Sequence, residues 1–347
     1  MSRAYSLEPL SREECDRWDE LTEPFSTREL FHRQAWLDYL SASRGIEIRK
    51  WAIRDSGQLR GYLCAGVVRK GPFRILASPL KGWGTNSMGP VTAPQFDHAA
   101  FLASLETLAK KERFAMVELE NCSLCVEAFE DAQYRQVAGW TYRVALSDPD
   151  DMWNRLTSTC RKSIRKALRS GLTVEDASEP CVADEYYDRY LDLMVRKGLV
   201  PPYPRSHPRL LFAHLKSADL LFSIRVLGPD GTLLAVGLFP HDDRTVYFWG
   251  GASWQEGRNL CPNDLLHWDG MRMAAQRGLT LYDMCGYGQF KKKFGGSLET
   301  TRRWHKSYVP GAELARQAYS FWFQTQSRAR GCFGRLVHQR PAGWAQQ

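Results

Sequence analysis

The spacing of apolar and polar residues predicts helices first, then a β-hairpin, in the first half of the chain. Residues 98–113 place Phe101, Leu105 and Leu108 on one face of a helix. The polar sequence 55–58, which contains a Gly, separates two apolar runs, as expected of a hairpin turn. The predicted elements of this half are helices over 11–21 and 34–43, strands over 49–54 and 59–68, a loop rich in Gly and Pro over 78–94, a helix over 98–113 and a strand over 115–119.

The second half repeats this order of elements, although the residues themselves show no internal repeat. Gly171 marks the end of a long helical pattern, and Gly228-Pro229-Asp230-Gly231 is typical of a hairpin turn. The predicted elements of this half are a strand over 140–146, helices over 149–170 and 184–197, a meander of strands over 221–227, 233–240 and 245–250, a helix over 263–277 and a strand over 279–284. The sequence therefore predicts two α+β units, 1–145 and 146–310, followed by a helical, basic tail over 311–347.

The bulk composition is that of a protein with a large buried core. The chain has 347 residues, of which 44% are apolar, enough for two domains. Its first thirty residues carry charges throughout and lack the apolar segment of a secretory signal. No run approaches the ~18 apolar residues that a spanning helix needs. We therefore expect a soluble, cytoplasmic protein without an integral membrane segment.

The cysteines do not indicate disulfides or a metal site. They are nine in number and scattered, which favours reduced thiols. Cys122 and Cys125 form one CxxC pair, but a zinc site needs a second pair of Cys or His at suitable spacing. We therefore expect no bound metal.

Positive charge is concentrated in two places. The net charge is +8, and from Thr301 onward eight Lys or Arg residues stand against one acid. A second block, residues 152–174, contains no acid and places Arg161 and Arg165 one helical turn apart. Such clusters attract phosphate groups of a nucleic acid, a nucleotide or a lipid pyrophosphate. A solvated helix face without a ligand is the alternative interpretation of either block.

A set of short segments carries a more specific signal. They are the basic helix that runs into a Gly and a strand over 153–174, the pair Tyr282-Asp283 with Gly286, the run Phe-Lys-Lys-Lys-Phe-Gly-Gly over 290–296, and, in the first half, Gly89-Pro90 with the strand over 117–120. In this order, and over about residues 30–310, the segments resemble the Fem-type aminoacyltransferases. The resemblance implies two tandem acetyltransferase-like (GNAT) half-domains, each with a mostly antiparallel mixed sheet flanked by helices.

The resemblance also implies a reaction, which is transfer of an aminoacyl group from charged tRNA to an amine of a peptidoglycan precursor or small peptide. Lys291 matches the lysine that the family presents to the reacting centre, where a cation stabilises the oxyanion of acyl transfer. Lys292 is expected to face solvent. Asp283 matches the family's aspartate and is a candidate proton acceptor, or alternatively holds the loop by accepting backbone N–H groups. The residues expected to bind substrate or phosphate are Arg161, Arg165, Lys293, Arg302 and Arg303.

The donor is left open between aminoacyl-tRNA and acyl-CoA, with no bound cofactor. Acetyl-CoA-dependent relatives hold the pyrophosphate on a Gly-rich loop at a helix N-terminus. The corresponding stretch here, 253–262, has a single Gly followed by a Pro, which weakens the CoA interpretation. Gly286-Tyr287-Gly288 lacks the third Gly of a dinucleotide loop.

Two other functions remain possible from the residues alone. One is a CoA- or carrier-dependent N-acyltransferase that modifies a sugar or amino acid in envelope polysaccharide assembly. The other is a nucleic-acid-binding protein on an inactive transferase scaffold, which the basic tail favours. The expected partners are aminoacyl-tRNA and an acceptor that bears a phosphate or an amine. The sequence does not indicate an oligomeric state.

Overall fold

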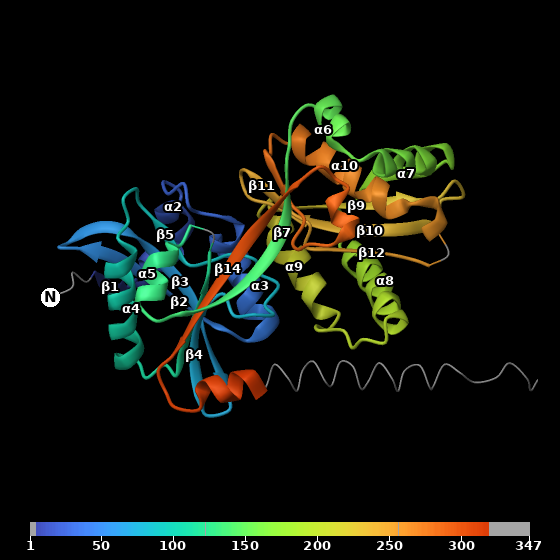
Figure 1. Cartoon of the computed structure of the whole chain (residues 1–347). Coiled ribbons are helices and arrows are strands. Elements are labelled where there is room, and N and C mark those ends of the chain that lie inside the picture. The colour runs from blue at the N-terminus through green and yellow to red at the C-terminus, as the bar shows by residue number, and fades with distance from the viewer. Residues whose placement is uncertain (1–4, 122, 256, 319–347) are drawn as a thin grey trace, which may run out of the picture.

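The computed structural model describes residues 5–121, 123–255 and 257–318, which form a large mixed sheet, a smaller antiparallel sheet and the helices that cover them (Figure 1). The first half contains β1 (Ser6–Pro9), α1 (Arg12–Asp16), α2 (Trp18–Thr22), the 3-10 helix η1 (Leu30–His32), α3 (Gln34–Arg44), β2 (Glu47–Asp55), β3 (Gln58–Lys70), β4 (Phe73–Ser78), β5 (Pro90–Thr92), α4 (His98–Lys111), β6 (Met116–Glu120), α5 (Val126–Asp131) and β7 (Arg135–Ala145). The second half contains α6 (Pro149–Arg155), α7 (Ser158–Arg169), β8 (Thr173–Asp176), α8 (Val182–Arg196), α9 (Ser206–Ser217), β9 (Leu221–Leu227), β10 (Leu233–Pro240), β11 (Thr245–Tyr247), β12 (Gly250–Ser253), the 3-10 helix η2 (Arg258–Leu260), α10 (Pro262–Gln276), β13 (Leu281–Asp283), α11 (Gln289–Lys292) and β14 (Ser297–Ser307).

The two halves follow the same strand plan. In the first half β2, β3 and β4 form an antiparallel meander, and β4 then pairs parallel with β6. In the second half β8, β9, β10 and β12 form the smaller antiparallel sheet, and β11 pairs parallel with β13. The prediction of two similar α+β units is therefore confirmed.

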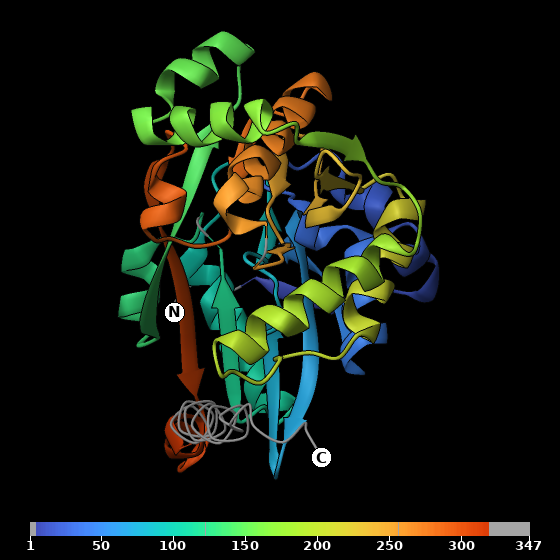
Figure 2. The same cartoon turned by 90° about the vertical axis from the view of Figure 1, so that its right-hand side faces the viewer.

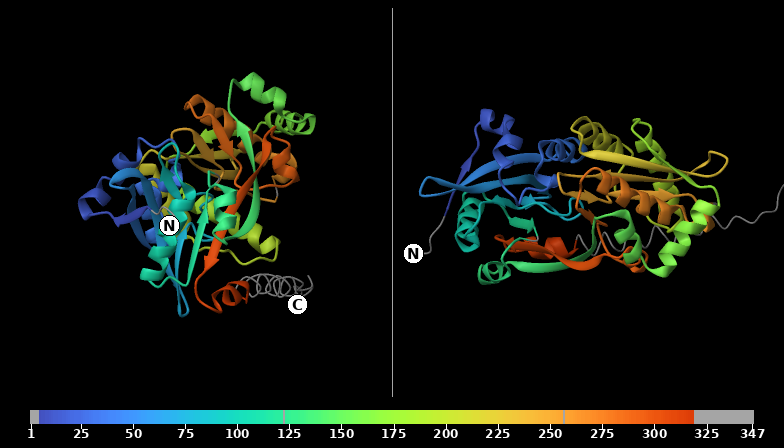
Figure 3. Two further views of the ribbon diagram at one scale, coloured as in Figure 1. Left: turned by 60° about the vertical axis from the view of Figure 1, so that its left-hand side comes forward. Right: turned by 90° about the horizontal axis from the view of Figure 1, so that it is seen from above.

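The strands β7 and β14 are exchanged between the halves. The large sheet runs in the order β1-β2-β3-β4-β6-β14-β7-β13-β11, so β14 of the second half lies beside β6 of the first. In turn β7 of the first half pairs with β13 of the second. Figure 3 shows, from above, that these two strands lie along one side of both halves, and Figure 2 shows β14 running down from the second half to the first. The predicted limits at residues 145 and 310 remain a prediction, because β7 and β14 contribute to both halves.

The hydrophobic core is continuous across the two halves. One cluster joins Trp36 and Tyr39 on α3 of the first half to Leu211 on α9 and Tyr247 on β11 of the second. A second cluster fills the outer part of the first half and includes Trp304, a fully buried residue of β14. Burial of one such large apolar side chain stabilises a fold by about 1.5–3 kcal/mol. The halves are therefore packed as parts of one folded body.

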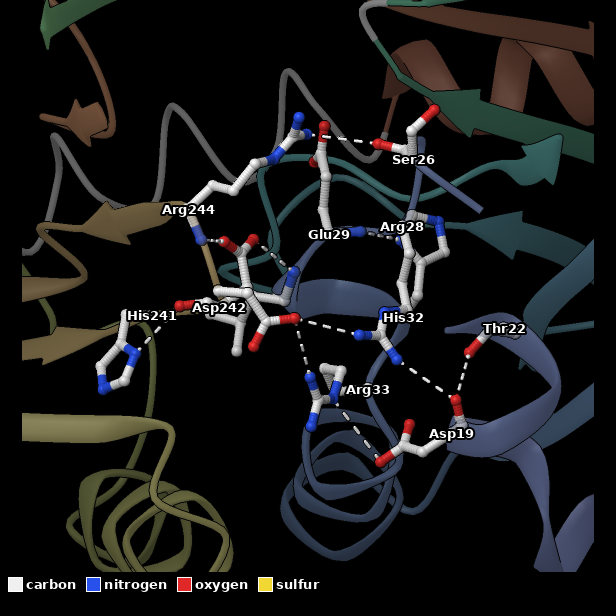
Figure 4. Close-up of polar contacts among 12 residues, drawn as sticks. Asp19, Thr22, Ser26, Arg28, Glu29, His32, Arg33, His241, Asp242 and Arg244 are labelled. Atoms are coloured by element: carbon white, nitrogen blue, oxygen red, sulfur yellow. Dashed lines mark hydrogen bonds and ion pairs between the residues drawn. The ribbon is translucent and has the colours of Figure 1, made fainter. Parts of the chain in front are cut away.

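Polar contacts fix the segment around η1 to the second half (Figure 4). The Leu30 N–H donates to Asp242 Oδ2 at 2.9 Å, and Arg28 Nη2 lies 3.0 Å from Asp243 Oδ2. Arg244 Nη2 in turn donates to the Ser26 carbonyl at 3.2 Å. These contacts hold the start of η1, and with it Glu29, in a defined place between the halves.

Several predicted elements are confirmed with small changes at their ends. The hairpins β2–β3 and β9–β10 and the helices α3, α4, α8 and α10 all occupy the predicted segments. Gly171, with a φ of 78°, ends α7 in the left-handed conformation that favours Gly. Within the described residues, no helix is long and apolar enough to cross a membrane.

The prediction of one helix over 149–170 is wrong, because the chain forms α6 and α7 instead. Leu156 between them is extended, with a ψ of 145°, and the Thr157 hydroxyl caps α7 by accepting the Cys160 N–H at 3.3 Å. The threonine hydroxyl thus accepts a backbone N–H that, in an unbroken helix, would donate to a backbone carbonyl of the preceding turn. The Arg161 guanidinium then donates to the carbonyl groups at the end of α6, including Leu156 at 2.5 Å.

Three further differences concern the second half. The predicted strand 245–250 is split into β11, which joins the large sheet, and β12, which continues the meander beside β10. The helix α9 was not predicted, since its first residues overlap a segment rich in Pro. The strand β14 was also not predicted. Residues 312–318, at the start of the predicted tail, are helical, and Cys122 and the basic residues beyond 318 lie outside the described residues.

Candidate active site

A cavity of about 480 Å³ lies where the exchanged strands meet the ends of β6 and β13. Its lining comes from both halves and mixes charged, hydroxyl and aromatic side chains with backbone. The lining residues are Thr85, Asn86, Ser87, Glu120, Gly139, Trp140, Thr141, Arg143, Tyr247, Asp283, Cys285, Gly286, Tyr287, Lys291, Thr301 and Arg303. Three of the predicted site residues, Asp283, Lys291 and Arg303, are therefore brought together.

Asp283 is a buried carboxylate that accepts three hydrogen bonds. Its Oδ1 accepts the Thr141 hydroxyl at 2.6 Å and the Cys285 N–H at 2.7 Å, and its Oδ2 accepts Arg143 Nε at 3.0 Å. Thr141 and Arg143 lie on β7, so this carboxylate ties the loop after β13 to the exchanged strand. The geometry is that of a residue which positions the loop, the second of the two roles considered for Asp283.

Lys291 lies in α11, the short helix that follows Gly288. Its side chain extends the ammonium toward the loop that follows β13. Its Nζ donates to the Met284 carbonyl at 2.5 Å and to the Cys285 carbonyl at 3.3 Å. Burial lowers the pKa of Lys291 below its ordinary value. Gly286 allows this approach, because a Cβ at that position would lie 3.3 Å from Nζ and its φ of 135° is unfavourable for other residues.

Arg303 lies in a buried network with two glutamates of β6. Its guanidinium donates to Glu118 Oε1 at 2.7 Å and also contacts Glu120 Oε2. Burial raises the pKa of Glu120, and the Arg303 charge opposes that shift. Arg302 is the next residue on β14 and so projects from the opposite face of the strand. Both arginines were predicted to bind substrate or phosphate, and they lie on opposite faces of β14.

The other predicted phosphate-binding residues lie outside the cavity lining. Arg161 is bonded to the backbone of α6, as described above, and the Arg165 guanidinium lies 5.3 Å from the centroid of the Trp153 ring. The Lys293 ammonium lies 2.5 Å from Asp264 Oδ1 and 4.0 Å from the centroid of the Phe290 ring. Each of these cations has an intramolecular partner, so their role in substrate binding remains a prediction.

The N-terminus of α10 occupies the place where relatives that use CoA are expected to hold a pyrophosphate. Asp264, in the first turn of α10, is a buried carboxylate paired with Lys293. A negative side chain at a helix N-terminus interacts favourably with the helix dipole and repels a second anion. The residue before the helix, Cys261, has a φ of 62°, and its side chain accepts no hydrogen bond from the first N–H groups of the helix.

One carboxylate near the cavity was not predicted from the sequence. Glu29 precedes η1, and burial raises its pKa to about 7, opposed by Ser87 and by the charge of Arg143. The atoms Glu29 Oε2 and Ser87 Oγ are both buried without a hydrogen-bond partner. The sequence around Glu29 carries no motif, and only the folding of η1 against the second half brings it to this place.

A family model for the acetyltransferase (GNAT) domain matches residues 154–293. This part of the chain is therefore similar to GNAT domains. The match begins at the end of α6 and ends just after α11, so the domain includes both Asp283 and Lys291.

Solved structures resemble both halves of the chain in fold. FemX is 14% identical with a TM-score of 0.69, and the match covers 89% of this chain and 99% of that one. The C-terminal domain of a protein from Agrobacterium fabrum described as a lysylphosphatidylglycerol synthetase is 14% identical with a TM-score of 0.56, covering 88% and 96%. A tandem GNAT protein from the clavulanic acid biosynthesis pathway is 9% identical with a TM-score of 0.54, covering 88% and 99%. A comparison with curated protein sequences gives no match. The predicted tandem acetyltransferase fold, and the resemblance to Fem-type proteins at the level of fold, are confirmed.

Proposed function

We propose that the chain is an N-acyltransferase that transfers an aminoacyl group from aminoacyl-tRNA to an amine, forming an amide. The acceptor is an amine of a peptidoglycan precursor or small peptide. The reaction needs neither a metal nor a bound cofactor, since the acyl group arrives activated as an ester of its donor.

The position of Lys291 is the observation that carries this proposal. A lysine ammonium has three N–H donors, and among the described residues two backbone carbonyls account for two of them. A third donor is available to a carbonyl oxygen in the cavity, where a negative charge develops as the amine attacks. A fixed, partly desolvated cation stabilises such a charge more strongly than water does.

The choice of donor rests on α10. The pair of Asp264 and Lys293 places a carboxylate in the first turn of this helix, where a CoA pyrophosphate would need free backbone N–H groups. This arrangement favours a donor that is not held by its pyrophosphate. The exposed basic residues of α7, Lys162, Lys166 and Arg169, supply a surface suited to the phosphates of tRNA.

Direct assay of amide formation tests the proposal. Purified protein is incubated with aminoacylated tRNA or with acyl-CoA, each with a panel of amines that includes a peptidoglycan precursor peptide, and products are identified by mass. We expect an amide from aminoacylated tRNA and none from acyl-CoA. Product from acyl-CoA alone would overturn the proposed donor, and no product from either donor would overturn the proposed function.

A further inference from the structure

Two carboxylates lie in contrasting environments, Asp283 in the cavity lining and Glu29 outside the lining, beside the lining residue Ser87. Asp283 accepts three hydrogen bonds, from the Thr141 hydroxyl, the Cys285 N–H and the Arg143 guanidinium, which hold it beneath the loop after β13. Glu29 differs, because its Oε2 atom is buried and has no hydrogen-bond partner. Pairs of acids whose environments differ in this way commonly divide the roles of positioning and proton transfer.

Ser87 connects Glu29 to the cavity. This residue lines the cavity, is 5% exposed, and lies beside the Glu29 carboxylate. Its Oγ atom is also buried without a hydrogen-bond partner. Two adjacent polar groups that both lack partners are uncommon in a folded protein, because each destabilises the fold unless a ligand or water satisfies it.

The surroundings hold Glu29 in place on both sides. Its own N–H donates to His32 Nδ1 at 3.0 Å, and the next residue, Leu30, donates to Asp242 of the second half. Burial lowers the pKa of His32 to about 4, so the ring stays neutral and Nδ1 remains an acceptor. The other charged and titratable groups that interact with Glu29 are Arg143, Asp242, Asp283 and Tyr247.

We propose that Glu29, acting through the Ser87 hydroxyl, accepts the proton that the amine loses during amide formation. The inference rests on the proposed acyl transfer. Neither Ser87 Oγ nor Glu29 Oε2 has a hydrogen-bond partner in the structure, so the relay requires the bound amine to turn the Ser87 hydroxyl toward the carboxylate. As the neutral amine then attacks, a C–N bond forms, Ser87 takes a proton from the nitrogen and passes its own to Glu29. When the C–O bond of the donor ester breaks, the proton returns through Ser87 to the leaving oxygen. The balance is amine plus ester giving amide plus alcohol.

The test compares the full-length protein with Glu29→Gln, Ser87→Ala and, as a matched control, Glu23→Gln, an exposed glutamate of the same segment. We measure kcat/KM from pH 5 to 8 with aminoacylated tRNA and the accepted amine. General base catalysis commonly contributes about 10²–10⁴-fold. We therefore expect Glu29→Gln to lower kcat/KM roughly a hundredfold at pH 8, Ser87→Ala to lower it at least tenfold, and Glu23→Gln to leave it unchanged.

The ratio of wild-type to Glu29→Gln activity is the decisive quantity, because ionisation of the amine itself cancels in it. We expect this ratio to grow as pH rises through about 7, where the Glu29 carboxylate loses its proton. A purely structural role for Glu29 predicts a ratio that does not change with pH, and that result would overturn the inference.

A second readout separates this inference from the proposed function. If the wild-type protein forms no amide, the proposed function fails, and the Tm values of wild type and Glu29→Gln are compared from pH 5 to 8. If the Tm of Glu29→Gln rises relative to that of the wild type as pH increases from 5 to 8, the Glu29 carboxylate exchanges its proton near neutral pH, which supports the inference. A constant difference overturns the inference without any activity measurement.

Discussion

At the scale of single residues, the most direct prediction concerns Lys291. Replacing it with Met keeps most of the side-chain stem and removes the charge that we propose acts on the reacting carbonyl. We expect Lys291→Met to lower kcat about a hundredfold with little change in KM, corresponding to roughly 3 kcal/mol of transition-state stabilisation. Lys292→Met is the matched control, because Lys292 is exposed to solvent. Equal losses in both variants, or a larger loss at Lys292, would show that Lys291 does not act on the transition state.

A second prediction at this scale concerns stability and pH. The pKa of Glu29 is about 7 in the folded protein against an ordinary value of 4.5. The unfolded chain releases this proton first as pH rises, so the stabilising contribution is present below pH 4.5 and is lost as pH rises through 7. The difference amounts to at most about 3 kcal/mol. In urea unfolding, the free energy of unfolding of Glu29→Gln should therefore rise relative to that of the wild type between pH 5 and 8. A difference of the same size at every pH would contradict a Glu29 pKa near 7.

At the scale of elements, α7 separates cations that hold the fold from cations that are free to bind a ligand. Arg161 bonds to the carbonyl groups at the end of α6, so Arg161→Ala should lower Tm by several degrees. Lys162 and Lys166 are exposed on the same helix, and their double replacement by Ala should leave Tm unchanged. It should instead raise KM for aminoacylated tRNA and weaken the salt dependence of binding.

The outcome that would contradict this division is a rise in KM for Arg161→Ala without any loss of stability, measured by thermal unfolding beside the kinetics. Such a result would restore the original prediction, in which Arg161 and Arg165 bind phosphate as a pair.

The elements also show how much of the structure the sequence predicts. Helices and hairpins that depend on neighbouring residues, such as α4 and β9–β10, follow from periodicity and turn residues. The strand β14 was missed because its partners β6 and β7 are distant in the sequence and its polar residues face a cavity. Asp283 and Lys291 were found through a motif, whereas Glu29 is brought beside Ser87 of the cavity lining by packing of the two halves, which no local pattern records.

At the scale of the whole molecule, the exchange of β7 and β14 makes the halves depend on one another. Trp304 of β14 is fully buried in the core of the first half. We expect Trp304→Ala to reduce the free energy of unfolding by about 3–5 kcal/mol. A chain ended at residue 296 should fail to fold either half, because β6 and β7 would both expose an unpaired edge.

Circular dichroism and gel filtration measure both effects. A chain ended after residue 318 is the control, since it keeps every described residue from β14 onward. A folded, monomeric first half in the chain ended at 296 would contradict the dependence.

The exchange has a consequence for how the protein is made. On the ribosome β6 is complete long before its neighbour exists, since Ser297 follows Glu120 by 177 residues. At a synthesis rate of about 5–20 residues per second, the interval is about 10–35 s. During this time the nascent first half presents an open sheet edge beside an unfilled core, a surface that chaperones bind and that neighbouring nascent chains can pair with. The yield of active protein in a cell is thus expected to depend on the speed of translation and on chaperone supply as much as on the stability of the finished fold.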